Sequence, residues 1–362
     1  MRNVLVVAKD LQLHGITSVI MSYFRALDRN LIRMDFAVGS PVDRDLLREI
    51  RAAGSQVELL PPKSEQPMGY YAGIDRAMKK KQYDILHVHG NSAVIGAELL
   101  LGLRNHIPYR IAHSHNSMCN HVWMHRLLRP FFSHTYTKGL ACSELAGTWM
   151  FGKRPFQVLQ NGLDTHKYVF RDADRAEIRT EYGLKNSYVV GHIGCFNRQK
   201  NHTRIVDIFC ALKAKLPSAK LLLVGDGGTR EEIENRVAAL HLEQDVIFAG
   251  TKQNIPQLLA AMDCFLLPSL HEGLSVVLLE AQISGLPCIL SDVCSSEAKL
   301  GEHYIPVSLD APDAAWVQAI CENPVEPADR RSFYAAHRDA VERFEITKTV
   351  RELTNLYCGR QK

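Results

Sequence analysis

The chain has 362 residues, more than a single hydrophobic core usually holds, so two domains are predicted. Hydrophobic residues make up 46% and charged residues 23% of the chain, which excludes extended disorder and fibrous repeats. The formal net charge is only +4, which argues against a nucleic-acid-binding protein. None of the nine cysteines forms a C-x-x-C pair, so we expect no disulfide framework and no structural zinc site.

The amino-terminal half alternates short β-rich runs with helical patterns. Its first strand, residues 3–8, contains only five consecutive apolar residues, too few for a signal peptide or a membrane span. We therefore expect a soluble cytoplasmic protein. A helix over 16–27 follows, with its apolar residues on one face. Further strands are expected at 34–38, 56–60, 84–88 and 109–113.

A second series of strands and helices begins after a polar stretch, residues 164–187. Its strands are expected at 188–193, 221–224, 246–248, 264–267 and 288–290. Its helices are expected at 203–216, 229–240, 255–261 and 274–284. Alternation of this kind indicates parallel sheets with helices on both faces.

We therefore predict an α/β protein of two doubly wound, Rossmann-like domains that face each other across a cleft. The first domain is expected to span residues 1–165 and the second residues 166–340. The last segment, 341–362, has apolar residues at helical spacing and must pack on one of the two domains.

The most informative stretch is 268–281, PSLHEGLSVVLLEA, which follows the apolar strand at 264–267. Ligands of open α/β sheets bind at this carboxyl edge. We expect a helix to start near Leu274, so that the amides of Gly273, Leu274 and Ser275 and the helix dipole bind a diphosphate. Glu280 is then placed to accept hydrogen bonds from a ribose, and Glu272 to accept them from a sugar.

Together with these residues, motifs along nearly the whole chain resemble the family 4 retaining glycosyltransferases of the GT-B fold, most closely the capsular and exopolysaccharide branch. The matching motifs are 84–89 DILHVH, 110–116 RIAHSHN, 141–144 ACSE, 160–164 QNGLD, 199–202 QKNH and the stretch 268–281. The resemblance implies transfer of a sugar from a nucleotide sugar, expected to be UDP-linked, without a metal or another cofactor. It assigns the transferred sugar to Glu272 and the donor ribose to Glu280.

The resemblance also places Lys200 beside the departing phosphate, where a cation stabilises the developing charge. The family pattern begins with Gly-Arg, whereas this chain has Gly194-Cys195, and a thiol cannot replace a guanidinium. Two interpretations stay open: Arg198 supplies the missing charge, or the site is weakened or used differently. A sugar-nucleotide-binding protein with little or no transfer activity is therefore one alternative.

The first domain is expected to bind the acceptor. Its first loop carries His14-Gly15 where relatives carry two glycines, and the Gly15 backbone is a candidate phosphate or acceptor contact. The resemblance implies that His113 contacts the donor sugar, with His115 as the other candidate. The pairs 87/89, 113/115 and 121/125 suggest a metal, but H-E-x-x-H is missing and no metal site is predicted.

Three further motifs allow a structural and a functional interpretation. Gly225 opens a Gly-Asp-Gly-Gly turn that lacks G-x-G-x-x-G, which disfavours a nicotinamide-dependent oxidoreductase. The structural interpretation is a tight turn between a strand and a helix. The functional interpretation is that this turn and the segment from Thr251 to Asn254 surround the base, and the two are compatible. The Asp-Ala-Asp at 172–174 is interpreted as a solvated helix start.

The acceptor implied by the resemblance is a saccharide or a lipid-linked saccharide in cell-surface polysaccharide synthesis. One basic and aromatic segment fits peripheral contact with the inner face of the membrane, although an amphipathic core helix explains it equally well. Its residues are Trp123, His125, Arg126, Arg129, Phe131 and Phe132.

Overall fold

The computed structural model describes residues 1–12, 15–119 and 121–359. The chain divides into two compact units: unit 1 contains residues 1–163 and 346–362, and unit 2 contains residues 164–345. The first crossing between the units lies two residues before the expected boundary. The segment expected at 341–362 is divided, because 346–362 belongs to unit 1 and 341–345 to unit 2.

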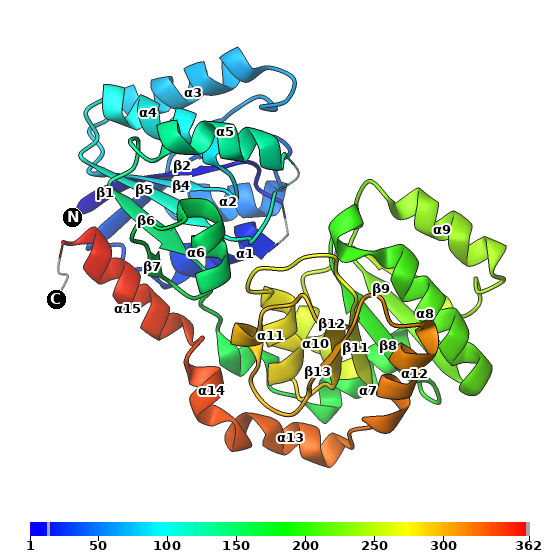
Figure 1. Cartoon of the computed structure of the whole chain (residues 1–362). Helices are drawn as coiled ribbons and strands as arrows, with labels where there is room; N and C mark the ends of the chain where they lie inside the picture. Colours follow the sequence, from blue (N-terminus) through cyan, green and yellow to red (C-terminus); the bar gives the residue numbers. More distant parts are fainter. Residues whose placement is uncertain (13–14, 120, 360–362) are drawn as a thin grey trace. The chain divides into compact units, whose positions relative to one another are not determined.

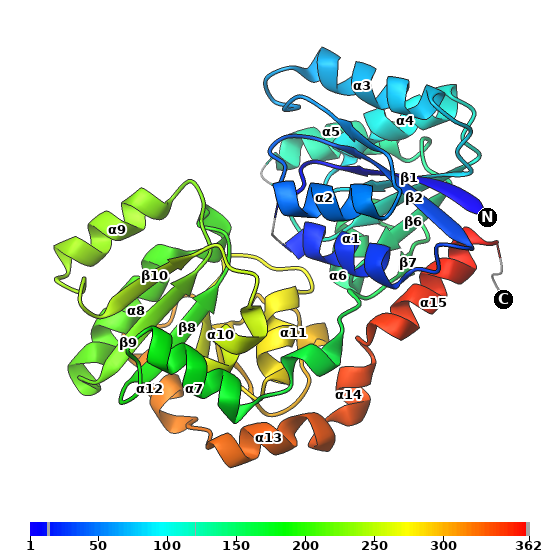
Figure 2. The ribbon, with the colours of Figure 1, turned by 180° about the vertical axis from the view of Figure 1, so that it is seen from behind.

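Unit 1 is built on a seven-stranded parallel sheet with the order β3-β2-β1-β4-β5-β6-β7. Its strands are β1 (Arg2–Ala8), β2 (Ile32–Val38), β3 (Val57–Leu59), β4 (Ile85–His89), β5 (Tyr109–Ser114), β6 (Lys138–Ala141) and β7 (Gln157–Val158). Its helices are α1 (Gly15–Ala26), α2 (Arg44–Ala52), α3 (Pro67–Lys79), η1 (Ala93–Ile95), α4 (Gly96–Arg104), α5 (Val122–Phe132), α6 (Glu144–Phe151) and α15 (Ile346–Tyr357). Helices α3, α4 and α5 lie together on one side of the sheet, and α1 and α15 lie on the other (Figure 1, Figure 2).

Unit 2 is built on a six-stranded parallel sheet with the order β10-β9-β8-β11-β12-β13. Its strands are β8 (Tyr188–Ile193), β9 (Ala219–Val224), β10 (Val246–Gly250), β11 (Cys264–Leu267), β12 (Cys288–Ser291) and β13 (Tyr304–Val307). Its helices are η2 (Thr165–Tyr168), α7 (Asp172–Glu181), η3 (Arg198–Lys200), α8 (His202–Lys215), α9 (Arg230–Ala239), α10 (Ile255–Ala261), α11 (Val276–Ile283), η4 (Ser296–Ala298), α12 (Asp313–Glu322), α13 (Pro327–Ala336) and α14 (Arg338–Glu342).

The core of unit 2 lies between its sheet and helices that include α8, α9 and α12. Phe209 of α8, Val237 of α9 and Trp316 of α12 are buried in one cluster with strand residues of the sheet. Each helix contributes one apolar stripe, which is the pattern of a helix packed on a sheet. Both units thus have the doubly wound arrangement that the sequence predicts.

The carboxyl-terminal helix α15 packs on unit 1. Its buried residues Ile346, Val350 and Leu353 follow the spacing that predicted a docked helix. The amide of Ile346 donates to the carbonyl of Leu163, and α15 lies against α1. Of the two partners that the sequence left open for this segment, the structure therefore selects the first domain.

Several elements differ from the expectations. Strands β6, β7 and β13 were not predicted, because β7 has only two residues and the apolar runs of β6 and β13 contain a glycine and a proline. The polar stretch expected to join the domains contains α7, whose Arg175 donates to the carboxylate of Asp263 and to backbone carbonyls at the end of α10. These bonds make part of the expected linker an integral element of unit 2.

Candidate functional site

Most of the predicted site residues lie at the carboxyl edge of the unit 2 sheet. Strands β8 and β11 are neighbours there, but the chain continues from β8 to β9 on one side and from β11 to β12 on the other. Ligands of open α/β sheets bind at such a switch point. The loops that follow these two strands, 194–201 and 268–275, carry the residues singled out in the sequence.

Hydrogen bonds hold these two loops together. The amide of Leu270 donates to the carbonyl of Gln199 (2.8 Å), and the side chain of Gln199 donates to the carbonyl of His271 (2.9 Å). The side chain of Asn201 donates to the carbonyl of Pro268 (3.1 Å). Asn201 has a φ of 56°, a left-handed conformation that asparagine tolerates better than most residues. The loops therefore form one connected edge.

Lys200 and Glu272 form an ion pair across this edge. The Lys200 Nζ lies 2.6 Å from Glu272 Oε1, and the two side chains are 14% and 7% exposed. A cation and a carboxylate so shielded from water interact more strongly than a surface pair. The sequence assigned them to different parts of a donor, and the structure brings them into direct contact.

The helix after this loop starts two residues later than expected. Ser275 is the N-cap of α11, with extended backbone angles, and the first helical residue is Val276 rather than Leu274. The amides without acceptors in the helix are therefore those of Val276, Val277 and Leu278. Gly273 and Leu274 belong to the preceding loop, because the chain is still extended at Ser275.

Ser275 has a second feature that suits ligand binding. Its side-chain oxygen is buried and makes no hydrogen bond with any residue that the structure describes. A buried hydroxyl without a partner is destabilising unless a ligand or water satisfies it. Ser275 thus offers a hydroxyl beside the free amides of the α11 N-terminus.

Glu280 is buried one turn further along α11. It is 9% exposed, and the hydroxyl of Tyr168 donates to its Oε1 at 2.8 Å. Burial raises the pKa of Glu280 to about 7, although the bond from Tyr168 acts in the opposite direction. Because the helix starts at Val276, Glu280 lies about 6 Å along the axis from its first residue rather than the expected 9 Å.

The loops after β9 and β10 complete this edge. A Cβ on Gly225, whose φ is 133°, would lie 2.1 Å from the carbonyl oxygen of Gly194, so only glycine fits there. The amide of Gly225 donates to the carbonyl of Gly250 (2.9 Å). The tight-turn interpretation of this motif is confirmed. Thr251 and Asn254, predicted near the base, are exposed on the following loop.

Arg198 and Cys195 both lie in the loop after β8. Cys195 is exposed, and Arg198, the first residue of η3, is also exposed and forms no ion pair with another described residue. The Arg198 guanidinium is thus available to an anionic ligand. That Arg198 compensates for the arginine missing at position 195 stays a prediction.

The predicted residues of unit 1 are less accessible than expected. His113 was expected at the end of its strand, but β5 continues to Ser114 and the His113 side chain is completely buried. His115, one residue beyond the strand, is 9% exposed and is the more accessible candidate. Gly15 is exposed and opens α1, while His14 lies outside the described residues.

Two other motifs are structural in this chain. Asp172 begins α7 and pairs with Arg331 at 2.7 Å, so the Asp-Ala-Asp motif is the helix start that was predicted. His125 is buried and accepts a hydrogen bond from the amide of Ala93 through Nδ1 (3.0 Å).

Two residues of the site were missed in the sequence. Tyr168 stands in a polar stretch without a motif, so only the fold brings its hydroxyl to Glu280. His192 is an inward-facing strand residue whose Nδ1 lies 2.8 Å from the carbonyl oxygen of Leu266. Its Nε2 is buried without a partner among the described residues, and burial holds the pKa of His192 well below its usual value.

Comparisons with known proteins show what this chain is similar to. Residues 174–319 match the family model "Glycosyl transferases group 1". The chain is 29% identical over 349 residues to the putative glycosyltransferase EpsF of Bacillus subtilis, covering 92% of this chain and 90% of that protein. It is 24% identical over 307 residues to an Escherichia coli UDP-Gal:alpha-D-GlcNAc-diphosphoundecaprenol alpha-1,3-galactosyltransferase, covering 78% of this chain and 77% of that one.

The fold has close counterparts among solved structures. The crystal structure of Anabaena HepE in complex with UDP-glucose superposes with a TM-score of 0.79 at 18% identity, covering 99% of this chain and 100% of that one. The glycosyltransferase WaaG superposes with a TM-score of 0.73 at 16% identity, covering 99% and 100%. The fold is GT-B. The family model and the two curated relatives support a glycosyltransferase.

Proposed function

We propose that this chain is a retaining glycosyltransferase that moves a sugar from a UDP-sugar to a saccharide or lipid-linked saccharide in cell-surface polysaccharide synthesis. The observation that carries the proposal is the Lys200–Glu272 pair at the switch point of unit 2, next to the free amides of α11. The UDP-glucose complex of HepE and the lipid-linked acceptor in the name of the Escherichia coli relative support the substrate classes.

The binding roles follow from the chemistry of each group. The amides at the start of α11 and the hydroxyl of Ser275 donate to the diphosphate, as helix N-termini do for anions. The carboxylate of Glu280 accepts hydrogen bonds from the ribose hydroxyls. When a donor sugar engages Glu272, Lys200 turns from this carboxylate to the β-phosphate.

The transfer step needs no nucleophile from the protein. The bond between the anomeric carbon and the phosphate oxygen breaks, and the acceptor oxygen bonds to the same face of that carbon. The acceptor proton passes to the departing phosphate oxygen. Lys200, Arg198 and the α11 amides stabilise the charge that develops on the diphosphate, so we propose that transfer is metal-independent.

The acceptor is assigned to unit 1. Gly15 leaves open space at the start of α1, since a Cβ built there meets no atom within 4 Å. Because His113 is completely buried, His115 is the better candidate for a contact with the donor sugar.

A second candidate function is nucleotide-sugar binding without transfer, and the exposed Cys195 favours it. A thiol supplies no fixed positive charge to the leaving diphosphate. In that case, Cys195→Arg restores transfer to a chain that otherwise only binds.

A ligand screen tests the proposed function. We expect UDP and UDP-sugars to raise the melting temperature of the chain, because a ligand that binds only the folded state stabilises it by mass action. NADH is the control and should have no effect. Mass spectrometry of products with saccharide acceptors then separates transfer from binding alone. Stabilisation by NADH but not by UDP would contradict the proposal and favour an oxidoreductase.

A surface of α5 supports peripheral contact with an anionic membrane. Trp123 and Leu127 are 66% and 69% exposed, and Phe131 continues the same face at a spacing of four residues. The exposed Arg126 adds positive charge, which favours anionic lipid. His125 and Phe132, predicted as part of this surface, are instead buried. No helix within the described ranges is long and apolar enough to cross a bilayer.

Sedimentation with phosphatidylglycerol vesicles tests this surface. Replacing Trp123 with serine should weaken vesicle binding by about tenfold, the loss expected from one buried aromatic side chain. Leu145→Ser, at an exposed apolar residue of α6 in the same unit, is the control. If both variants bound the vesicles equally well, α5 would not be the membrane contact.

A further inference from the structure

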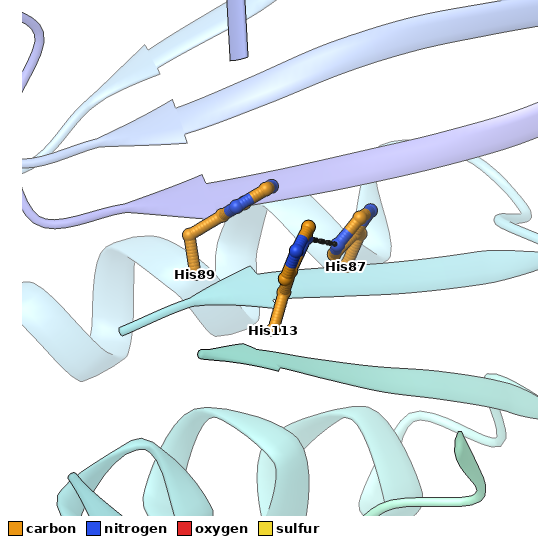
Figure 3. Close-up of side chains that lie close together, drawn as sticks. All are labelled: His87, His89 and His113. Atoms are coloured by element: carbon orange, nitrogen blue, oxygen red, sulfur yellow. Dashed lines mark hydrogen bonds between the residues drawn. The ribbon is translucent and has the colours of Figure 1, made fainter. Parts of the chain in front are cut away.

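Four histidines of unit 1 gather on one face of two neighbouring strands. His87 and His89 alternate along β4, and His113 and His115 lie at alternate positions of β5 and just beyond its end. Side chains at alternate positions of a strand share a face, and His89 is the register partner of His113. Figure 3 shows the rings of His87, His89 and His113 close together above the strands.

The imidazoles are completely or nearly buried. His87 and His113 are 1% and 0% exposed, and His89 is 6% exposed. Burial holds the pKa of each of these three rings well below its usual value, and the neighbouring rings act in the same direction. The three rings are therefore enclosed by protein rather than by solvent.

Hydrogen bonds engage the outer nitrogens of two of these rings. The hydroxyl of Tyr357, from α15, lies 2.6 Å from His87 Nδ1, and His115 Nε2 lies 2.8 Å from His89 Nδ1. Metal-binding histidines are held in this way, by a partner on the nitrogen that does not face the ion. Nε2 is thus left as the ligand atom of His89, while Nε2 of His87 faces the ring of His113.

The protein alone leaves the third ring incompletely bonded. His113 Nδ1 lies 3.1 Å from His87 Nε2, while His113 Nε2 is buried with no hydrogen-bond partner among the described residues. If the hydroxyl of Tyr357 donates to His87 Nδ1, His87 carries its proton on Nε2 and donates it to His113 Nδ1. The proton of His113 is then on Nε2, which is a buried N–H without an acceptor among the described residues. If the hydroxyl of Tyr357 instead accepts from His87 Nδ1, His113 Nε2 carries a buried lone pair without a donor among the described residues.

We propose that His87, His89 and His113 bind a transition-metal ion, with Zn²⁺ the best match. One nitrogen of each ring can be chosen so that all three lie within 4.8 Å of one another. The 3.1 Å between His87 Nε2 and His113 Nδ1 is close to the separation of about 3.3 Å between two nitrogens on a tetrahedral zinc, so these two atoms are the proposed ligands and the unpartnered Nε2 of His113 is not one of them. Imidazole ligands suit Zn, Cu, Fe and Ni, and exclude the oxygen-seeking Mg²⁺ and Ca²⁺.

Such an ion would connect three elements of unit 1. Its ligands come from β4 and β5, and Tyr357 ties it to the carboxyl-terminal helix α15. This site is made entirely by unit 1, whereas the proposed donor contacts at Lys200 and Glu280 belong to unit 2. The metal is therefore assigned a structural role that does not depend on the proposed transfer mechanism.

Metal analysis of the full chain tests the site directly. After purification without a metal-affinity tag and dialysis against a chelator, the chain should take up about one Zn²⁺ and gain melting temperature. Co²⁺ should give the visible absorption of a nitrogen-ligated tetrahedral ion without a thiolate charge-transfer band. A chain that takes up no Zn²⁺, or that shows the thiolate band, would overturn the proposal.

Two variants and a control locate the ion. Tyr357→Phe keeps the packing of α15 but removes the outer partner of His87, so the affinity for Zn²⁺ should fall by about 10–100-fold. His113→Gln should abolish stoichiometric binding. His125→Gln, at a buried histidine of the same unit, should bind Zn²⁺ like the wild type. Unchanged Zn²⁺ affinity in the two cluster variants would overturn the assignment even if both are less stable.

Discussion

Replacing Lys200 with methionine is expected to lower kcat for sugar transfer by about 10²–10³-fold, the usual cost of removing one group that stabilises charge in a transition state. Methionine keeps the length of the side chain but carries no charge for the departing diphosphate. Steady-state kinetics with the UDP-sugar identified by the ligand screen measure the effect. Lys299→Met, at an exposed lysine of the same unit, is the control. A kcat within about twofold of the wild type in Lys200→Met would contradict the role of this lysine.

The same substitution should destabilise the ligand-free chain. With Lys200 gone, Glu272 keeps a carboxylate that is only 7% exposed and has lost the ammonium 2.6 Å away. Breaking a buried pair in this way costs about 3–5 kcal/mol. The double variant Lys200→Met/Glu272→Gln removes both charges and should recover much of this loss in urea unfolding. A double variant as unstable as the sum of the single variants would show that the two side chains are not coupled.

Strongly periodic segments of the fold were predictable from the sequence. Strands β8 and β11 and helix α10 have the bounds expected from their apolar runs, because each is buried in a doubly wound layer. Strands β6, β7 and β13 were not predictable, because β7 has only two residues and the apolar runs of β6 and β13 are interrupted by a glycine and a proline. Only the start of helix α7 was predicted, from the Asp-Ala-Asp at 172–174. The arginines of α7 hydrogen-bond to backbone carbonyls of α10, so the face that packs on unit 2 is polar in sequence and gives no apolar period.

Most residues of the candidate site were predictable from the sequence, but the contacts between them were not. Glu272 and Lys200 stand 72 positions apart, and their pairing follows only from the adjacency of β8 and β11. The start of α11 was misplaced by two residues because Ser275, a good N-cap residue, follows a leucine that fits the helical pattern. The histidine cluster was judged by spacing along the chain, whereas its geometry depends on the register between β4 and β5.

Glu280 is expected to make the stability of the ligand-free chain depend on pH. Its pKa is raised to about 7 by burial, so the unfolded chain loses this proton at lower pH than the folded chain does. The free energy of unfolding therefore falls as pH rises from about 4.5 to about 7, and above pH 7 this loss stays near 3 kcal/mol. Glu280→Gln has no carboxyl group to ionise at this position and does not lose this stability. In urea unfolding, the free energy of unfolding of the variant minus that of the wild type should therefore rise by about 3 kcal/mol between pH 4.5 and pH 8.

The affinity for UDP of the wild type and of Glu280→Gln, measured by calorimetry at pH 6 and pH 8, tests the donor site most directly. If the ionised Glu280 accepts hydrogen bonds from the ribose, the wild type should bind UDP about tenfold more tightly at pH 8 than at pH 6, beyond any change shared with the variant. At pH 8, the variant should bind about 10–100-fold more weakly than the wild type, the value of a hydrogen bond to a charged group. Equal affinities of the two proteins at both pH values would contradict a nucleotide site at the start of α11.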